Sequence, residues 1–186
     1  MQRISALNPD TTTGTSKELF DAVHKKFGVV PNMIRTMGNS PAVLNAYLSF
    51  SGALDASSIG ATLNKLIAIA VANANRCEYC NAIHGYLAEH LLKIDGETVV
   101  RARSADSSNS KIKKALEFAI TLTQKRGHLE NADVDTLKEA GYNEAQIAEI
   151  IAAVSLNIFT NYFNTALTVS VDFPKAEFAE SVSVIY

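Results

Sequence analysis

The chain has 186 residues, of which 47% are hydrophobic and 19% are charged, and its formal net charge is −2. This length predicts one compact domain, because domains most often contain roughly 100 to 150 residues. Lys and Arg are scattered along the sequence and form no basic stripe, which argues against a nucleic-acid partner.

The N-terminal segment MQRISALNPDTTTG contains no apolar stretch of the kind that signal peptides require. The longest apolar run, residues 66–72, is much shorter than the ~18 residues of a membrane span. We therefore expect a cytoplasmic protein with no membrane partner. In that reducing compartment a Cys-x-x-Cys pair is more often catalytic or metal-binding than structural.

Helix signals begin early in the chain. Thr15 and Glu18 have the spacing of a capping box and predict a first helix that ends at Gly28. Two helices that start with proline follow, over residues 31–38 and from Pro41 onward. The N-terminal third of the chain therefore reads as helical.

The next segment, TLNKLIAIAVANAN, is apolar almost all round from Leu66 to Val71, which is typical of a helix buried on every side. Asn75 and Arg76 mark a bend, and a second helix runs on to about Leu92. Residues at spacings of three and four form one stripe of that helix: Cys77, Cys80, His84, Leu87 and Leu91.

The second half of the chain continues the helical pattern. A short helix follows Asp95, and after the polar loop 104–110 come helices that end at Gly127 and Gly141 and a long one that starts at Asn143. We predict an all-α fold and a single domain over residues 1–186. Its ends are an N-terminal arm, residues 1–15, and a C-terminal tail, residues 169–186, which is extended or docks on a neighbouring subunit.

The stretch RCEYCNAIH holds both cysteines of the chain and one of its four histidines. A zinc site is disfavoured, because Cys77 and His84 are separated by about 10 Å of helical rise and no further cysteine exists. Covalent haem attachment requires a histidine directly after the second cysteine, where Asn81 stands. We therefore predict no metal and no organic cofactor.

Thiol redox chemistry fits the spacing better. Cys77 and Cys80 are three residues apart near a helix N-terminus, close enough for a disulfide and placed where the helix dipole stabilises a thiolate. His84 lies one turn beyond Cys80, where it can take the thiol proton or hold a bridging water. This predicts Cys80 as the attacking thiolate and Cys77 as the resolving thiol. In the simpler interpretation, the three residues only fill a buried stripe.

The run LIAIAVANANRCEYCNAIHGYL resembles the alkylhydroperoxidase-D-like, carboxymuconolactone decarboxylase-like family, in its peroxidase-related branch. The segments VVPNMIRTMGNSPAVLNAYLSFSGAL, KALEFAITLTQKRGHL and SLNIFTNYFNTALTVSVDFP are similar to it too. The resemblance implies that Cys80 attacks a hydroperoxide, that its sulfenic acid condenses with Cys77, and that an external dithiol reductant protein restores the pair. It also implies a homo-oligomer, commonly a trimer or hexamer.

The sequence departs from the family at one position of the proton relay. The family has a Glu twelve residues before the first motif cysteine, where this chain has Lys65. Lys65 and His84 lie at similar distances on either side of the bend at Asn75, so antiparallel helices would bring them level. The ammonium would lower the pKa of Cys80, whereas a neutral lysine would act as a base. The sequence leaves both roles open.

Two hypotheses about function follow. The first is a thiol-dependent hydroperoxide reductase with Cys80, Cys77, His84 and Lys65 at its site. The second is a redox-responsive or structural homo-oligomer that lost efficient turnover when the Glu became Lys65. The resemblance also makes Asn161 and Asn164, from the family's NYFN segment, candidates for the pocket wall, although a structural amide pair explains them as well.

Overall fold

The computed structural model describes residues 1–180, which form nine helices and no strand. The all-α prediction is confirmed. The helices are α1 (Gly14–Phe27), α2 (Asn32–Met37), α3 (Pro41–Asp55), α4 (Gly60–Ala74), α5 (Glu78–His90), α6 (Gly96–Arg103), α7 (Ser110–Gln124), α8 (Asn131–Glu139) and α9 (Glu144–Leu167).

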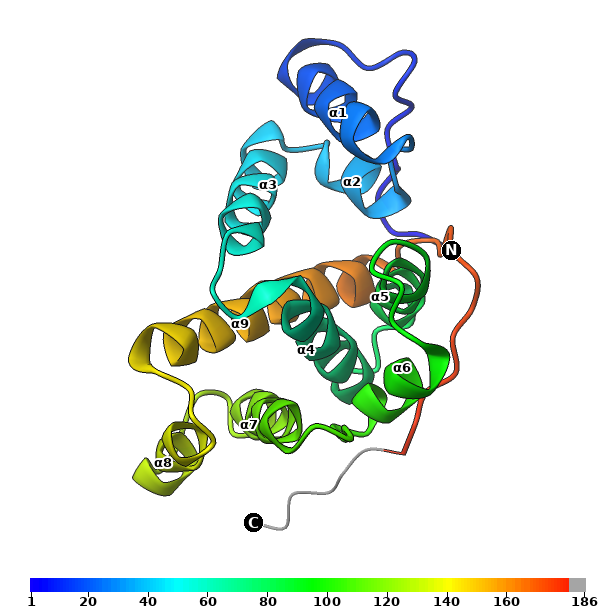
Figure 1. The fold of residues 1–186 in the computed structure, drawn as a ribbon. Coiled ribbons are helices and arrows are strands. Elements are labelled where there is room, and N and C mark those ends of the chain that lie inside the picture. The colour runs from blue at the N-terminus through cyan, green and yellow to red at the C-terminus, as the bar shows by residue number, and fades with distance from the viewer. Residues whose placement is uncertain (181–186) are drawn as a thin grey trace.

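Helix α4 lies at the centre of the fold, with α5, α6, α7 and α9 packed around it (Figure 1). Every residue from Leu66 to Asn73 is buried, as expected for a helix that is apolar on all sides. Among the described helices, α9 alone is long and apolar enough to cross a membrane. One face of α9 packs against α4, α5 and α7, so in this fold it serves as a core helix.

Several predicted helix ends are confirmed by their caps. The Ser40 hydroxyl accepts a hydrogen bond from the main chain at the start of α3, and Asp95 does the same for α6. The prediction that Thr15 and Glu18 form a capping box is wrong. Gly14, with φ +67°, turns the chain into the helix earlier, and α1 begins there with Thr13 as its N-cap.

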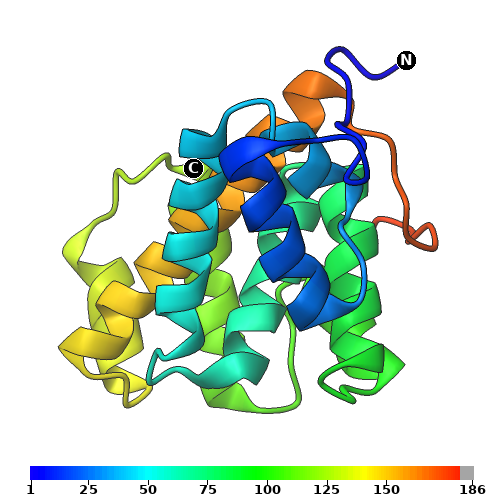
Figure 2. The ribbon, with the colours of Figure 1, turned by 90° about the horizontal axis from the view of Figure 1, so that it is seen from above.

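Helices α1, α2 and α3 form a layer on one side of α4 and α9 (Figures 1 and 2). Two hydrophobic clusters result, one within α4–α9 and one between this layer, α5 and the chain after α9. Cys77 and Cys80 belong to the second cluster. The cysteine pair therefore lies where the two parts of the fold meet.

The N-terminal arm and the described part of the C-terminal tail both pack on the rest of the chain. The main chain of Arg3 in the N-terminal arm donates a hydrogen bond to Leu167 O at the end of α9 (2.9 Å). Residues 169–180 of the tail are extended, and Asn73 and Asn81 hold them through hydrogen bonds to the main chain of Ala179 and Glu177. The remaining part of the predicted tail, residues 181–186, lies outside the described residues.

Candidate active site

The two cysteines are placed by the sharp connection between α4 and α5. Asn75 ends α4, and Arg76 with φ 53° turns the chain so that Cys77 becomes the N-cap of α5. The Cys77 sulfur accepts a hydrogen bond from the main-chain N–H of Cys80 (3.2 Å). A disulfide joins Cys77 to Cys80, with their Cα atoms 5.3 Å apart. The structure thus contains the bond that the spacing predicted.

A pocket of about 260 Å³ opens beside the pair, with walls from α3, α4, α5 and α9. Cys80 lines this pocket and Cys77 does not, although each cysteine is only 1% exposed. A small molecule in the pocket therefore meets the sulfur of Cys80 first. The roles of Cys80 as the attacking atom and Cys77 as the resolving one stay a prediction.

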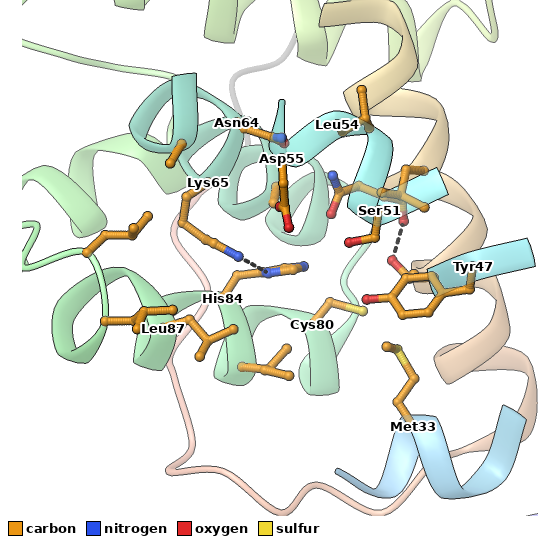
Figure 3. A pocket seen from close by; sticks show the side chains of 18 of the residues that line it. Met33, Tyr47, Ser51, Leu54, Asp55, Asn64, Lys65, Cys80, His84 and Leu87 are labelled. Atoms are coloured by element: carbon orange, nitrogen blue, oxygen red, sulfur yellow. Dashed lines mark hydrogen bonds between the residues drawn. The ribbon is translucent and has the colours of Figure 1, made fainter. Parts of the chain in front are cut away.

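Lys65 and His84 face each other in the pocket wall (Figure 3). The Lys65 Nζ lies 3.4 Å from His84 Nδ1, so the antiparallel placement that the sequence predicted is confirmed. Burial in the pocket wall, and then the Lys65 charge, lower the pKa of His84 well below 6.5. Burial lowers the pKa of Lys65 from 10.5 to about 8, against the opposing charge of Asp55. At neutral pH the pair is therefore an ammonium beside a neutral imidazole.

The hydrogen bonds of His84 restrict what its ring can do. In the neutral ring, Nδ1 accepts from the Lys65 ammonium, and the other nitrogen donates to Asn157. The Asn157 Nδ2 is itself bonded to Ala153 O (2.8 Å), which leaves the amide oxygen for His84. With both ring nitrogens engaged, His84 is better suited to holding Lys65 in place than to taking the thiol proton.

The sulfur of Cys80 has a polar neighbour on α9. Asn164 Nδ2 donates to Cys80 Sγ (3.3 Å) and to Met33 Sδ (3.2 Å). The Asn164 Oδ1 is buried and has no hydrogen-bond partner among the described residues. Asn161 instead accepts from Asn75 Nδ2 (2.9 Å) and does not line the pocket. Of the two amides that the sequence singled out, Asn164 belongs to the site and Asn161 is structural.

Tyr47 is a pocket residue that sequence reasoning missed. Its ring faces the Cys80 sulfur (Figure 3). Burial raises the pKa of Tyr47 to about 12, and a hydrogen bond with Ser51 partly offsets this rise. Tyr47, Ser51 and Asp55 are spaced by four residues on α3 and all line the pocket. That polar stripe in an otherwise apolar helix was the signal available in the sequence.

The sequence and the fold are similar to those of known proteins. Residues 41–119 match the carboxymuconolactone decarboxylase family. A peroxidase-related protein of Ralstonia eutropha JMP134, described as an alkylhydroperoxidase AhpD core, aligns with a TM-score of 0.80 and 20% identity over 92% of each chain. The chain therefore has the alkylhydroperoxidase-D-like fold, and its residues 41–119 are similar to the carboxymuconolactone decarboxylase family.

Other solved members show the range of the alkylhydroperoxidase-D-like fold. A peroxidase-related protein of Silicibacter sp. TM1040 has a TM-score of 0.81 and 22% identity over 91% of each chain. The debrominase Bmp8 has a TM-score of 0.72 and 26% identity, over 84% of this chain and 86% of its own. No curated protein matches the sequence. The members of this fold that resemble the chain therefore include both peroxidase-related proteins and a debrominase.

Proposed function

We propose that this protein is a thiol-dependent hydroperoxide reductase that cycles through the Cys77–Cys80 disulfide. The observation that carries the proposal is the asymmetry of the pair, in which Cys80 alone lines the pocket while Cys77 lies behind it within bonding reach. The similarity to two peroxidase-related proteins supports the same chemistry.

The reaction would proceed in three balanced steps. The Cys80 thiolate attacks the outer oxygen of a hydroperoxide ROOH, the O–O bond breaks, and RO⁻ takes a proton to leave as ROH. Cys77 then attacks the Cys80 sulfenic acid, which forms the disulfide and releases water. A dithiol reductant protein exchanges with the disulfide and is itself oxidised. The sum is ROOH and a dithiol giving ROH, water and a disulfide.

Three features would favour the attacking thiolate. The amide N–H of Asn164 already points at the Cys80 sulfur. Cys80 lies in the first turn of α5, at the positive end of the helix dipole. The Lys65 ammonium contacts His84 in the same pocket wall and adds a positive charge to the partial charge of the helix dipole. Together they would stabilise the thiolate without a carboxylate relay.

The pocket suits an organic hydroperoxide better than hydrogen peroxide alone. Apolar side chains from α3, α5 and α9 contribute much of its wall, among them Leu54, Leu87 and Leu156. Its volume of about 260 Å³ is just below that of sites for drug-sized ligands, roughly 300 Å³ and more. The unpaired Asn164 Oδ1 beside the sulfur can accept the O–H of the hydroperoxide.

The test is consumption of cumene hydroperoxide with dithiothreitol as reductant. The wild type should turn over and Cys80→Ser should not. Without dithiothreitol, Cys77→Ser should consume about one equivalent and stop at the sulfenic acid. Loss of peroxide at equal rates in the wild type and Cys80→Ser would refute the proposal. Disulfide formation without sustained turnover would identify the redox-responsive protein instead.

A second candidate is reductive dehalogenation, favoured by the similarity to Bmp8, which is also known as an alanine-for-cysteine variant in complex with 2,3,4-tribromopyrrole. The Cys80 thiolate would take bromine from a ring carbon that gains a proton, forming an S–Br bond. Cys77 would then displace bromide and form the disulfide, so the ring is reduced and the dithiol oxidised. Bromide release from tribromopyrrole, measured in the same variants, separates this reaction from peroxide reduction.

A further inference from the structure

Lys65 presents an ammonium to the pocket that makes no direct ion pair among the described residues, and the charge of Asp55 acts on it only from a distance. Among residues 1–180, no carboxylate lies within ion-pairing distance of its Nζ, and its polar contact is the neutral ring of His84 at 3.4 Å. The other lysine of the pocket, Lys26, is paired with Asp55 at 2.9 Å and is largely exposed. The two lysines are therefore in different electrostatic situations.

The charges that face the pocket sum to one positive charge. From α1 and α3 come Lys26 and Asp55, which cancel, and Tyr47 from α3 is neutral. From α4 comes Lys65, and from α5 the neutral His84. A partly buried cation without a direct ion pair costs stability, which a ligand of opposite charge would offset on binding.

We propose that Lys65 is a specificity-determining residue and that the pocket selects substrates that carry an anionic group, such as a carboxylate. This inference rests on the proposed function for the reaction but concerns the binding step. Lys65, His84 and Cys80 lie in a row (Figure 3). His84 is one helical turn from Cys80, so the anion and the reacting O–O bond should be separated by about the length of a para-substituted benzene ring. A Glu at position 65, the residue of the family pattern, would repel such a substrate.

Binding can be tested without turnover by calorimetry with two unreactive probes of equal size, para-isopropylbenzoate and para-isopropylbenzamide. The benzoate should bind the wild type about 10-fold more tightly, which is the scale of a charge-assisted hydrogen bond. Lys65→Met should abolish this preference and Lys65→Arg should keep it. Lys25→Met, which removes an exposed charge outside the pocket on α1, is the matched control and should also keep it.

The pH dependence gives a further readout. Because the pKa of Lys65 is about 8, the preference for the benzoate should decline as the pH rises above that value, while the benzoate itself stays ionised. Equal binding of the two probes to the wild type, or a preference that survives in Lys65→Met, would overturn the proposal.

Turnover separates this inference from the proposed function. The wild type should show a kcat/KM about 10-fold higher for para-carboxycumene hydroperoxide than for cumene hydroperoxide, and Lys65→Met should lose that ratio. Equal kcat/KM values would leave the reductase in place and refute the selectivity. Selective binding of the benzoate without turnover of either hydroperoxide would refute the reductase and leave the anion site.

Discussion

The two cysteines have different neighbours, although their spacing alone does not distinguish them. Cys80 meets the pocket and Asn164, whereas the Cys77 sulfur accepts the N–H of Cys80 at the N-terminus of α5. A reducing thiolate that enters the pocket would attack Cys80 and release Cys77. The leaving thiolate is then stabilised by that N–H and by the helix dipole.

Asn164 should set the reactivity of Cys80. In a Cys77→Ser background, Asn164→Leu removes the N–H donor to the sulfur, so we expect the Cys80 thiolate to be less stable and its alkylation to require a higher pH. The pH dependence of alkylation by iodoacetamide measures this. Asn161→Leu, on the same helix but away from the pocket, is the control. An unchanged alkylation profile in Asn164→Leu would contradict the assignment.

Lys65 should cost stability at neutral pH. Its pKa is about 8 in the folded protein and 10.5 when unperturbed, so below pH 8 both states carry the proton and the folded state bears the full cost of burying it. Between pH 8 and 10.5 the unfolded state binds more protons than the folded state. The free energy of unfolding of the wild type therefore rises with pH in this range.

We therefore expect Lys65→Met to increase the free energy of unfolding by on the order of 2 kcal/mol at pH 7. The gain should shrink as the pH approaches 10.5. Urea denaturation at a series of pH values measures it. A gain that is constant from pH 7 to 10.5 would show that apolar packing, not the lysine charge, causes the difference.

At the scale of the helices, local signals predicted much of the site. The bend after Asn75, the cysteines at the start of α5 and the facing pair of Lys65 and His84 all follow from helical periodicity on two adjacent segments. Helical periodicity marks the polar stripe that contains Tyr47 but does not show what the stripe faces, and it does not mark Asn157 at all. Their place depends on how α3 and α9 pack around α5, and contacts between segments so far apart leave no periodic signal.

The packing of α1 on α2 offers a test at this scale. A Cβ on Gly38 would overlap the ring of the buried Phe20, whereas a Cβ on Gly52, within α3, would meet nothing within 4 Å. Gly38→Ala should therefore destabilise the protein by about 1–3 kcal/mol through overpacking. Gly52→Ala should stabilise it by about 0.5–1 kcal/mol, because alanine favours the helix.

Chemical denaturation of both glycine variants gives the comparison. Since the two substitutions add the same methyl group, their opposite signs would isolate the contact with Phe20. Equal effects of the two variants would mean that Phe20 moves aside without cost.

At the scale of the molecule, the site includes residues from outside the segment that matches the family model. The matched residues 41–119 include α3, α4 and α5, and hence Tyr47, Lys65 and both cysteines. Met33 comes from α2 and Asn164 from α9, both outside that segment. The surroundings of the Cys80 sulfur are therefore completed by parts of the chain that lie outside the matched segment.

The outer face of α9 bears on the assembly of the whole protein, which the sequence predicts to be a homo-oligomer. Ile151, Phe159 and Tyr162 are exposed at spacings that place them on one stripe, opposite the buried face of this helix, and Tyr162 is 63% exposed. Grouped large apolar residues on a surface mark interaction sites. We propose that a second copy of the chain covers this stripe.

Light scattering after size-exclusion chromatography should then give a mass that is a multiple of 20.0 kDa, with trimers and hexamers expected. Phe159→Glu combined with Tyr162→Glu places charge in the stripe and should shift the protein towards the monomer, because burying unpaired carboxylates between subunits is costly. Val100→Glu, an exposed apolar position on α6, should leave the mass unchanged. A single 20.0 kDa species of the wild type at micromolar concentration would show that the stripe is not an interface between copies.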